Sequence, residues 1–289
     1  MLALAITAVL ISAFTWWFAT GAVLWLGRLD TEWHGVASLS LAVPAGLAVL
    51  LVVALRDEVT VIAIVAGFMS AIAIWAWHEA TFLFGQVLGP RREPCPADAT
   101  ARQRFGLAFR ALRDHEFALA ATLLLLVAAT WGAGNTVAAQ TFAALWFCRL
   151  AAKLCIFEGV PAMSHDLMPE RLRHLKSYFG NARPGAAFAL AIAGMGTSFG
   201  ILATHALAAE GAVDLVGPTL LATLVALAIA EHAFMVLPVR DERLWRWALP
   251  HVKPSSEGTC TFMGRAIHTR RLQGVALKAR AVVPTDRAT

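Results

Sequence analysis

The sequence predicts an all-α membrane protein, a polytopic bundle of about seven transmembrane helices. Of its 289 residues, 58% are hydrophobic and only 15% are charged, whereas a soluble globular domain carries about 25% charged residues. The apolar residues also gather into seven runs, and an α-helix needs about 20 residues to cross the ~30 Å hydrocarbon core of a bilayer. The runs cover residues 2–27, 36–55, 59–84, 117–134, 137–157, 185–208 and 214–237.

The flanks of these runs indicate how they are used. Run 2–27 lacks the basic leading region of a cleavable signal peptide, and it is longer than the ~7–15-residue apolar core of such a peptide. We therefore expect it to stay as a helix. Runs 117–134 and 137–157 are separated only by Asn135 and Thr136, which predicts a tight helical hairpin.

The basic residues predict the orientation. Nearly all of the 24 Lys and Arg residues lie in the segments that follow the odd-numbered runs, and Arg56 is the exception on the opposite side. Because cytoplasmic loops are enriched in Lys and Arg, we expect the N-terminus outside and the C-terminus in the cytoplasm. The net charge of +5 is then a feature of topology, and no nucleic-acid partner is expected.

Two cytoplasmic segments, 101–116 and 166–179, combine basic residues with apolar residues at helical spacing. Such helices lie in the headgroup plane or dock onto a partner, and both interpretations stay open. The Trp-rich stretch 244–247 is expected to anchor at the membrane interface. Residues 1–250 would form the transmembrane helical domain, and the basic segment 251–289, rich in Pro, Ser, Thr and Arg, is predicted to be a disordered cytoplasmic tail.

Three of the runs carry ionisable side chains at membrane depth. A charge inside a bilayer is expensive, so each of these residues is a candidate functional residue. They lie roughly 6–12 Å from the cytoplasmic ends of runs three, five and seven, at 1.5 Å of rise per residue. The predicted intramembrane polar cluster consists of His78, Glu79, Arg149, Lys153, Glu231 and His232.

Three interpretations of this cluster remain open. In the structural one, the two glutamates pair with Arg149 and Lys153 and lock three helices together, because intramembrane charges generally pair. In the second, the acids and histidines form a proton or ion path. In the third, a neutral imidazole binds the metal of a macrocyclic ligand.

Neighbouring residues add two further predictions. Trp75 and Trp77 lie at the depth of the cluster, where a flat aromatic ligand could stack, although anchoring at the interface also explains Trp residues. We therefore take Trp75, Trp77 and His78 as candidate pigment contacts. Gly196 and Gly200 form a GxxxG motif, which is typical of close helix packing in membranes.

Four stretches of the chain resemble the PuhE family of photosynthetic-complex assembly proteins, of the DUF3623 type. They are WAWHEATFLFGQVLGPRR (75–92), LWFCRLAAKLCIFEGVP (145–161), LMPERLRHLKSYF (167–179) and AEHAFMVLPVRDERLWRWAL (230–249). The resemblance covers about residues 1–250 and departs from the family pattern at Cys155 and Glu158, where Asn and Leu are expected.

The resemblance implies a polytopic membrane protein of phototrophic bacteria whose gene lies near that of the reaction-centre H subunit. It further implies a non-enzymatic accessory factor of the inner (cytoplasmic or intracytoplasmic) membrane. This factor would help to assemble the reaction centre and light-harvesting complex, with their subunits or other assembly factors as partners. It would act through transient handling of bacteriochlorophyll or a precursor.

The residues themselves leave one alternative, an ion-coupled or proton-linked membrane transporter in which Glu79 and Glu231 take part in a relay. No catalytic residue or metal site is predicted, because the chain has no GxSxG, phosphate-loop or zinc-type spacing. An enzyme is therefore not expected.

Overall fold

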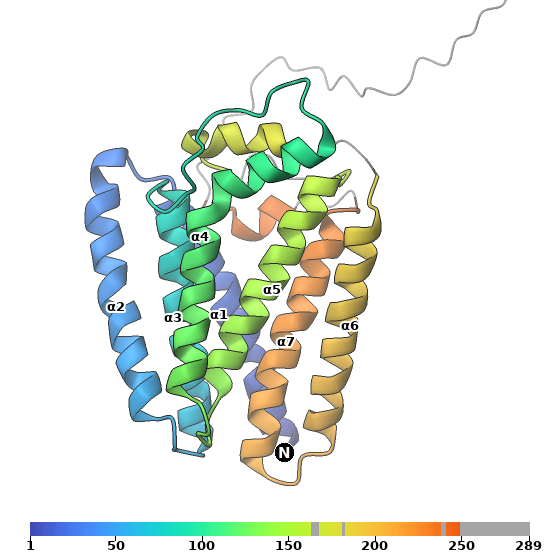
Figure 1. Cartoon of the computed structure of the whole chain (residues 1–289). Helices are drawn as coiled ribbons and strands as arrows, with labels where there is room; N and C mark the ends of the chain where they lie inside the picture. Colours follow the sequence, from blue (N-terminus) through green and yellow to red (C-terminus); the bar gives the residue numbers. More distant parts are fainter. Residues whose placement is uncertain (163–167, 181–182, 238–240, 249–289) are drawn as a thin grey trace, which may run out of the picture. The chain divides into compact units, whose positions relative to one another are not determined.

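A computed structural model describes residues 1–162, 168–180, 183–237 and 241–248. It confirms the predicted all-helical bundle (Figure 1). The α-helices are α1 Leu2–Leu26, α2 His34–Ala54, α3 Val61–Leu83, α4 Ala101–Ala129, α5 Val137–Glu158, α6 Ala186–Leu207 and α7 Ala212–Phe234. Within these ranges the structure also has the short 3₁₀ helices η1 Thr31–Trp33, η3 Glu170–Tyr178 and η4 Asp241–Trp245. The predicted tail 251–289 lies outside the described residues.

Six of the seven predicted runs are helices long and apolar enough to cross a membrane, and the run 117–134 is the exception. Its residues 117–129 belong to α4, one continuous helix that also contains the segment 101–116. The helix expected over 101–116 is therefore present, but it is continuous with the helix of the next run, and its place at the membrane surface stays a prediction. The apolar part of α4 spans only 117–129, about 20 Å at 1.5 Å per residue, because charged residues precede it and the helix ends at Ala129.

Consecutive helices alternate in direction, so the connections gather at two ends of the bundle (Figure 1). At one end, the Asn135 backbone N–H donates to the Arg56 carbonyl over 2.8 Å, and Arg56 Nη1 donates to the Ala129 carbonyl over 3.0 Å. These bonds join the α2–α3 and α4–α5 connections. Arg56 is also the basic residue that the sequence set apart from the others.

The opposite end is held together by two arginines that bind the last carbonyls of helices. Arg104 donates to the carbonyls of Phe157 and Phe179, each over 3.1 Å. Arg171 donates to the Leu83 carbonyl over 3.3 Å and contacts His34 Nε2 at 2.8 Å. Helix C-termini leave carbonyls unsatisfied, so both contacts tie α4 and η3 to the bundle.

The segment 166–179, where the structure describes it, contains the 3₁₀ helix η3. Its buried residues Leu172, Leu175 and Tyr178 recur every third position, which matches the three residues per turn of a 3₁₀ helix. Their apolar face packs against α3 and α4 residues within the chain. Burial lowers the pKa of His174, so the positive charge of this helix comes from its Arg and Lys residues.

The Trp-rich stretch after α7 packs onto α1. Trp245 is 3% exposed, and its ring lies 5.7 Å from that of Trp16. Its Nε1 donates to the Trp17 carbonyl over 3.1 Å, while Trp17 Nε1 donates to the Leu244 carbonyl over 2.8 Å. Trp247 remains 47% exposed, and its anchoring at the membrane interface stays a prediction.

The GxxxG motif of α6 faces away from its neighbours in the chain. Helix α6 packs on α7 through Met195, but a Cβ built on Gly196 or Gly200 would meet no atom within 4 Å. Close packing of this motif on another helix is therefore absent among the described residues. Contact with a partner's helix stays a prediction.

The close contact between Gly89 and α4 yields a testable prediction. The Gly89 N–H donates to the Ala111 carbonyl over 2.8 Å, and a Cβ at Gly89 would lie 1.8 Å from the Arg110 carbonyl oxygen. Gly89→Ala must push the α3–α4 connection off α4, and we expect a loss of about 1–3 kcal/mol, the usual range for overpacking. Thermal unfolding of the purified protein in detergent measures it.

Gly106→Ala is the matched control, since Gly106 lies within α4 and a Cβ there meets nothing within 4 Å. Replacing a helical glycine by alanine stabilises a helix by roughly 0.5–1 kcal/mol. Equal melting temperatures for the two variants would contradict the close approach at Gly89.

Candidate functional site

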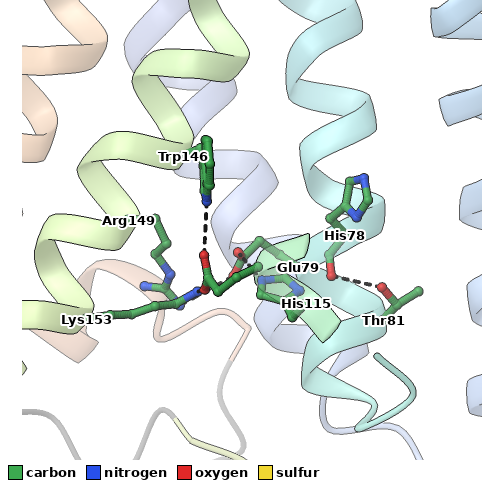
Figure 2. A network of polar contacts seen from close by, with 8 residues as sticks. His78, Glu79, Thr81, His115, Trp146, Arg149 and Lys153 are labelled. Atoms are coloured by element: carbon green, nitrogen blue, oxygen red, sulfur yellow. Dashed lines mark hydrogen bonds and ion pairs between the residues drawn. The ribbon is translucent and has the colours of Figure 1, made fainter. Parts of the chain in front are cut away.

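Five charged or ionisable side chains from α3, α4 and α5 meet at one level of the bundle (Figure 2). We call this set the polar layer, and its members are Glu79, His115, Glu116, Arg149 and Lys153. Two ion pairs organise it: Arg149 Nη2 lies 3.4 Å from Glu79 Oε2, and Lys153 Nζ lies 2.5 Å from Glu116 Oε1. Three helices are thus joined by opposite charges.

Glu116 is the better satisfied of the two acids. Besides Lys153, it accepts a hydrogen bond from Trp146 Nε1 at Oε2 over 3.0 Å. Both its side chain and that of Lys153 are largely buried, at 11% and 16% exposure. Both carboxylate oxygens of Glu116 therefore have a hydrogen-bond partner, and Lys153 balances its negative charge.

Glu79 lies between two cationic or potentially cationic groups. His115 Nε2 is 3.6 Å from Glu79 Oε1, beyond normal hydrogen-bond length, and Arg149 approaches the other oxygen. The His115 side chain is fully buried and its ring lies 4.5 Å from the Phe82 ring. Figure 2 shows the imidazole beneath the Glu79 carboxylate, so α4 supports the acid of α3 from one side.

Arg149 is the exposed member of the layer. Its side chain is 45% exposed, against 11% for Glu79. A guanidinium carries five N–H donors, and the contact with Glu79 uses one nitrogen at the long distance of 3.4 Å. Where the structure describes the chain, this is the one hydrogen bond of the guanidinium, and most of its donors contact no other described acceptor.

Sequence reasoning missed His115 and Glu116, because they fell in the segment expected at the membrane surface. It expected Lys153 to pair with Glu79 or Glu231, whereas the structure pairs it with Glu116. The signal was present in the sequence: these residues directly precede the apolar run 117–134. An acid and a histidine at that edge lie at the same depth as the other predicted charges.

The candidate pigment contacts are linked through their rings. The Trp77 ring lies 5.0 Å from that of His78, and both Trp75 and His78 lie edge-on to Phe142, at 5.4 and 6.1 Å. His78 Nε2 also lies 2.9 Å from Thr122 Oγ1 of α4, and Trp77 Nε1 donates to the Ser38 carbonyl of α2 over 3.2 Å. Of the three residues, Trp75 lines the cavity described below, and a contact with pigment stays a prediction.

The two ionisable residues of α7, Glu231 and His232, have different surroundings. His232 Nδ1 lies 2.8 Å from the Ala228 carbonyl of its own helix, which makes Nδ1 the protonated nitrogen when the ring is neutral. Its Nε2 is buried and has no hydrogen-bond partner among the described residues. Glu231 instead lines the cavity.

Beside the polar layer lies a cavity of about 380 Å³, which we call the inner cavity. It is bounded by α1, α3, α5 and α7 and is covered by residues of α4, η3 and η4. Its charged lining residues are Glu79, Arg149, Lys153 and Glu231, and its aromatic ones are Trp16, Trp75, Phe82, Phe157, Tyr178, Phe179, Phe234 and Trp245. Pockets of roughly 300–1,000 Å³ with apolar walls and few polar groups are typical of small-molecule sites.

Glu158, where the chain departs from the resembled family pattern, stays outside the polar layer. Its Oε2 accepts hydrogen bonds from the backbone N–H groups of Gly185 and Ala187, over 3.2 and 3.0 Å. A carboxylate is favourable at a helix N-terminus, so Glu158 caps α6. Among the described residues, no three His, Cys, Asp or Glu side chains are placed to hold a metal ion.

Comparison with known proteins gives one family and one relative. The family model described as "Protein of unknown function (DUF3623)" matches residues 1–256. A protein of Rhodobacter capsulatus, described as "Uncharacterized 30.4 kDa protein in puhA 5'region", is 37% identical over 254 residues, which cover 86% of this chain and 92% of the relative. No solved structure matches the chain.

The Lys153–Glu116 pair predicts a specific pattern of stabilities. Breaking a buried pair by removing one partner costs about 3–5 kcal/mol, whereas replacing both partners by apolar residues is often nearly neutral. We expect Glu116→Leu and Lys153→Met each to lower the melting temperature strongly, and the double variant to recover most of the loss. Melting temperatures in detergent of the unaltered protein, the two single variants and the double variant complete the double-mutant cycle.

Arg113→Gln and Asp114→Asn provide the control, since this pair on the same helix has side chains 42% and 47% exposed. Exposed pairs contribute about 0–1 kcal/mol. Additive losses in the Glu116 and Lys153 variants would show that the two charges do not stabilise each other.

Proposed function

The chain belongs to the DUF3623 family, as its resemblance to the PuhE type predicted, and we propose that it is a non-enzymatic assembly factor for the photosynthetic reaction centre and light-harvesting complex. It would reside in the inner membrane of a phototrophic bacterium. It would act by holding bacteriochlorophyll or a precursor transiently, in contact with complex subunits or other assembly factors.

The observation that carries this proposal is the description of the relative, which places it in the puhA 5' region. The family resemblance links that region to the reaction-centre H subunit. A membrane protein encoded beside a photosynthesis gene is expected to act on the same membrane complex. The six candidate membrane-spanning helices are consistent with such a location.

The structure supports a holding role through the inner cavity. The cavity combines aromatic walls with charged residues on one side, and flat aromatic ligands stack on such walls. The neighbouring acids and bases of the polar layer are engaged in ion pairs between helices. Fixed charges of this kind keep the cavity walls in place, which suits a protein that binds and releases a ligand.

A transporter is the second candidate, because buried acids and histidines are the usual material of proton relays. The polar layer lies at one level of the bundle (Figure 2), and a relay needs groups arranged along the membrane normal. An absorption spectrum of the protein purified from phototrophic cells separates the two roles. Bound pigment supports the assembly role, whereas a colourless protein that moves protons in vesicles supports transport.

The assembly role predicts the effect of substitutions in phototrophically grown cells. We expect His78→Ala and Glu79→Ala to lower the amount of assembled reaction-centre complex several-fold, while the protein itself remains in the membrane. Absorption spectra of membranes measure the complex, and immunoblots measure the protein. Glu93→Ala is the control, because the Glu93 side chain is 79% exposed outside the bundle helices. Unchanged complex levels in both variants would restrict the two residues to a structural role.

The expected orientation is tested separately. Reporter fusions at Asp57 and at Asp98 fall in connections at opposite ends of the bundle. Because basic residues concentrate at the end that contains Asp98, we expect a cytoplasmic reporter signal there and an external signal at Asp57. The same signal at both positions would show that α3 does not cross the membrane.

A further inference from the structure

We infer that the inner cavity binds an amphipathic acid, with its carboxylate or phosphate group on Arg149 and its apolar body against the aromatic wall. This inference goes beyond the assembly role, and it holds whether or not that role is correct. It assigns both a chemical class of ligand and the side chain that recognises it.

The first argument is that the two cations of the polar layer are paired to different degrees. Lys153 is 2.5 Å from Glu116 and both side chains are largely buried, so this cation is already neutralised. Arg149 differs, because its side chain is 45% exposed and its contact with Glu79 is 3.4 Å long. Arg149 is therefore the cation of the layer that can still bind a second anion.

The second argument is where Arg149 lies. It lies in the C-terminal half of α5, a candidate membrane span, and it lines a mostly apolar cavity. Each hydrogen-bond donor left unsatisfied in a hydrocarbon environment costs several kcal/mol. The remaining N–H groups of Arg149 therefore require acceptors. A planar guanidinium matches carboxylate and phosphate groups, which it binds through two parallel hydrogen bonds.

The third argument is the rest of the wall. Trp16 of α1 and Trp245 of η4 line the cavity with their rings 5.7 Å apart, and Trp75 and Phe82 line it from α3. Such rings offer a large apolar surface for the body of the ligand. A purely polar anion would gain nothing from this wall, so the ligand must be amphipathic.

Two acids line the cavity together with Arg149. Glu79 of α3 lies 3.4 Å from Arg149 Nη2, and Glu231 lines the cavity from α7. The acid group of the ligand would therefore bind the guanidinium N–H groups that Glu79 does not contact.

Energy transfer from tryptophan to parinaric acid, a fluorescent polyene fatty acid, tests this inference on the full-length protein in detergent. Three of the donor residues, Trp16, Trp75 and Trp245, line the cavity. We expect the acid to bind at least about tenfold more tightly than its methyl ester, equivalent to about 1.4 kcal/mol. Arg149→Gln should abolish this preference while leaving the affinity for the ester unchanged.

Matched variants separate binding from folding. Arg113→Gln removes an exposed cation of α4 and should keep the preference for the acid. Thr20→Phe fills the cavity from α1 and should weaken the acid and the ester alike, which keeps the inference testable if Arg149→Gln fails to fold. Equal affinities for acid and ester in the unaltered protein, or a preference that survives Arg149→Gln, would overturn it.

Competition identifies the source of the acid group. Displacement of parinaric acid by oleate, but not by phosphatidylglycerol, indicates a free carboxylic acid as the ligand. Displacement by phosphatidylglycerol, but not by phosphatidylcholine, indicates the phosphate of an anionic lipid. Displacement by phosphatidylcholine as effectively as by either acid would reject the inference, because the site would then bind apolar chains without reading charge.

Discussion

Charged side chains can be held inside a membrane only when opposite charges or hydrogen-bond partners accompany them, and the arrangement of α3, α4 and α5 follows from this requirement. Glu79, Glu116, Arg149 and Lys153 come from three helices, and their pairing fixes both the depth and the rotation of each helix. Lipid tails provide no hydrophobic force between helices. The ion pairs therefore specify which helix faces contact each other, which apolar packing alone would not do.

The same requirement explains why α4 is built differently from its neighbours. A run of 117–129 is too short to span the hydrocarbon core by itself, yet α4 extends back through His115 and Glu116 to Ala101. Its two ionisable residues can be buried in the bundle because they have partners there. His115 lies beside Glu79, and Glu116 pairs with Lys153 and accepts a hydrogen bond from Trp146. The polar layer thus stabilises a helix that hydropathy alone would not place in the membrane.

Much of this organisation could be predicted from the sequence, because the residue types alone determine where the apolar runs lie. Six helices and the convergence of Glu79, Arg149 and Lys153 followed from run length and depth. Pairing could not be predicted, since depth does not reveal which face of a helix meets which neighbour. The insertion of Trp245 beside Trp16 was equally hidden, because an indole among basic residues is also typical of a membrane interface.

The outcome at Arg149 shows how a structural lock and a binding site can share the same residues. A layer in which every charge is fully paired would be inert, and Glu116 with Lys153 and Trp146 comes close to that condition. Glu79 and Arg149 do not, because their contact is long, the Arg149 side chain is 45% exposed, and Arg149 lines the inner cavity. The buried pair holds the helices in place, and this rigidity lets the less satisfied pair present donors to a ligand. Structural and functional interpretations of the cluster therefore apply to different members of it, and the exposed fraction of each side chain distinguishes them.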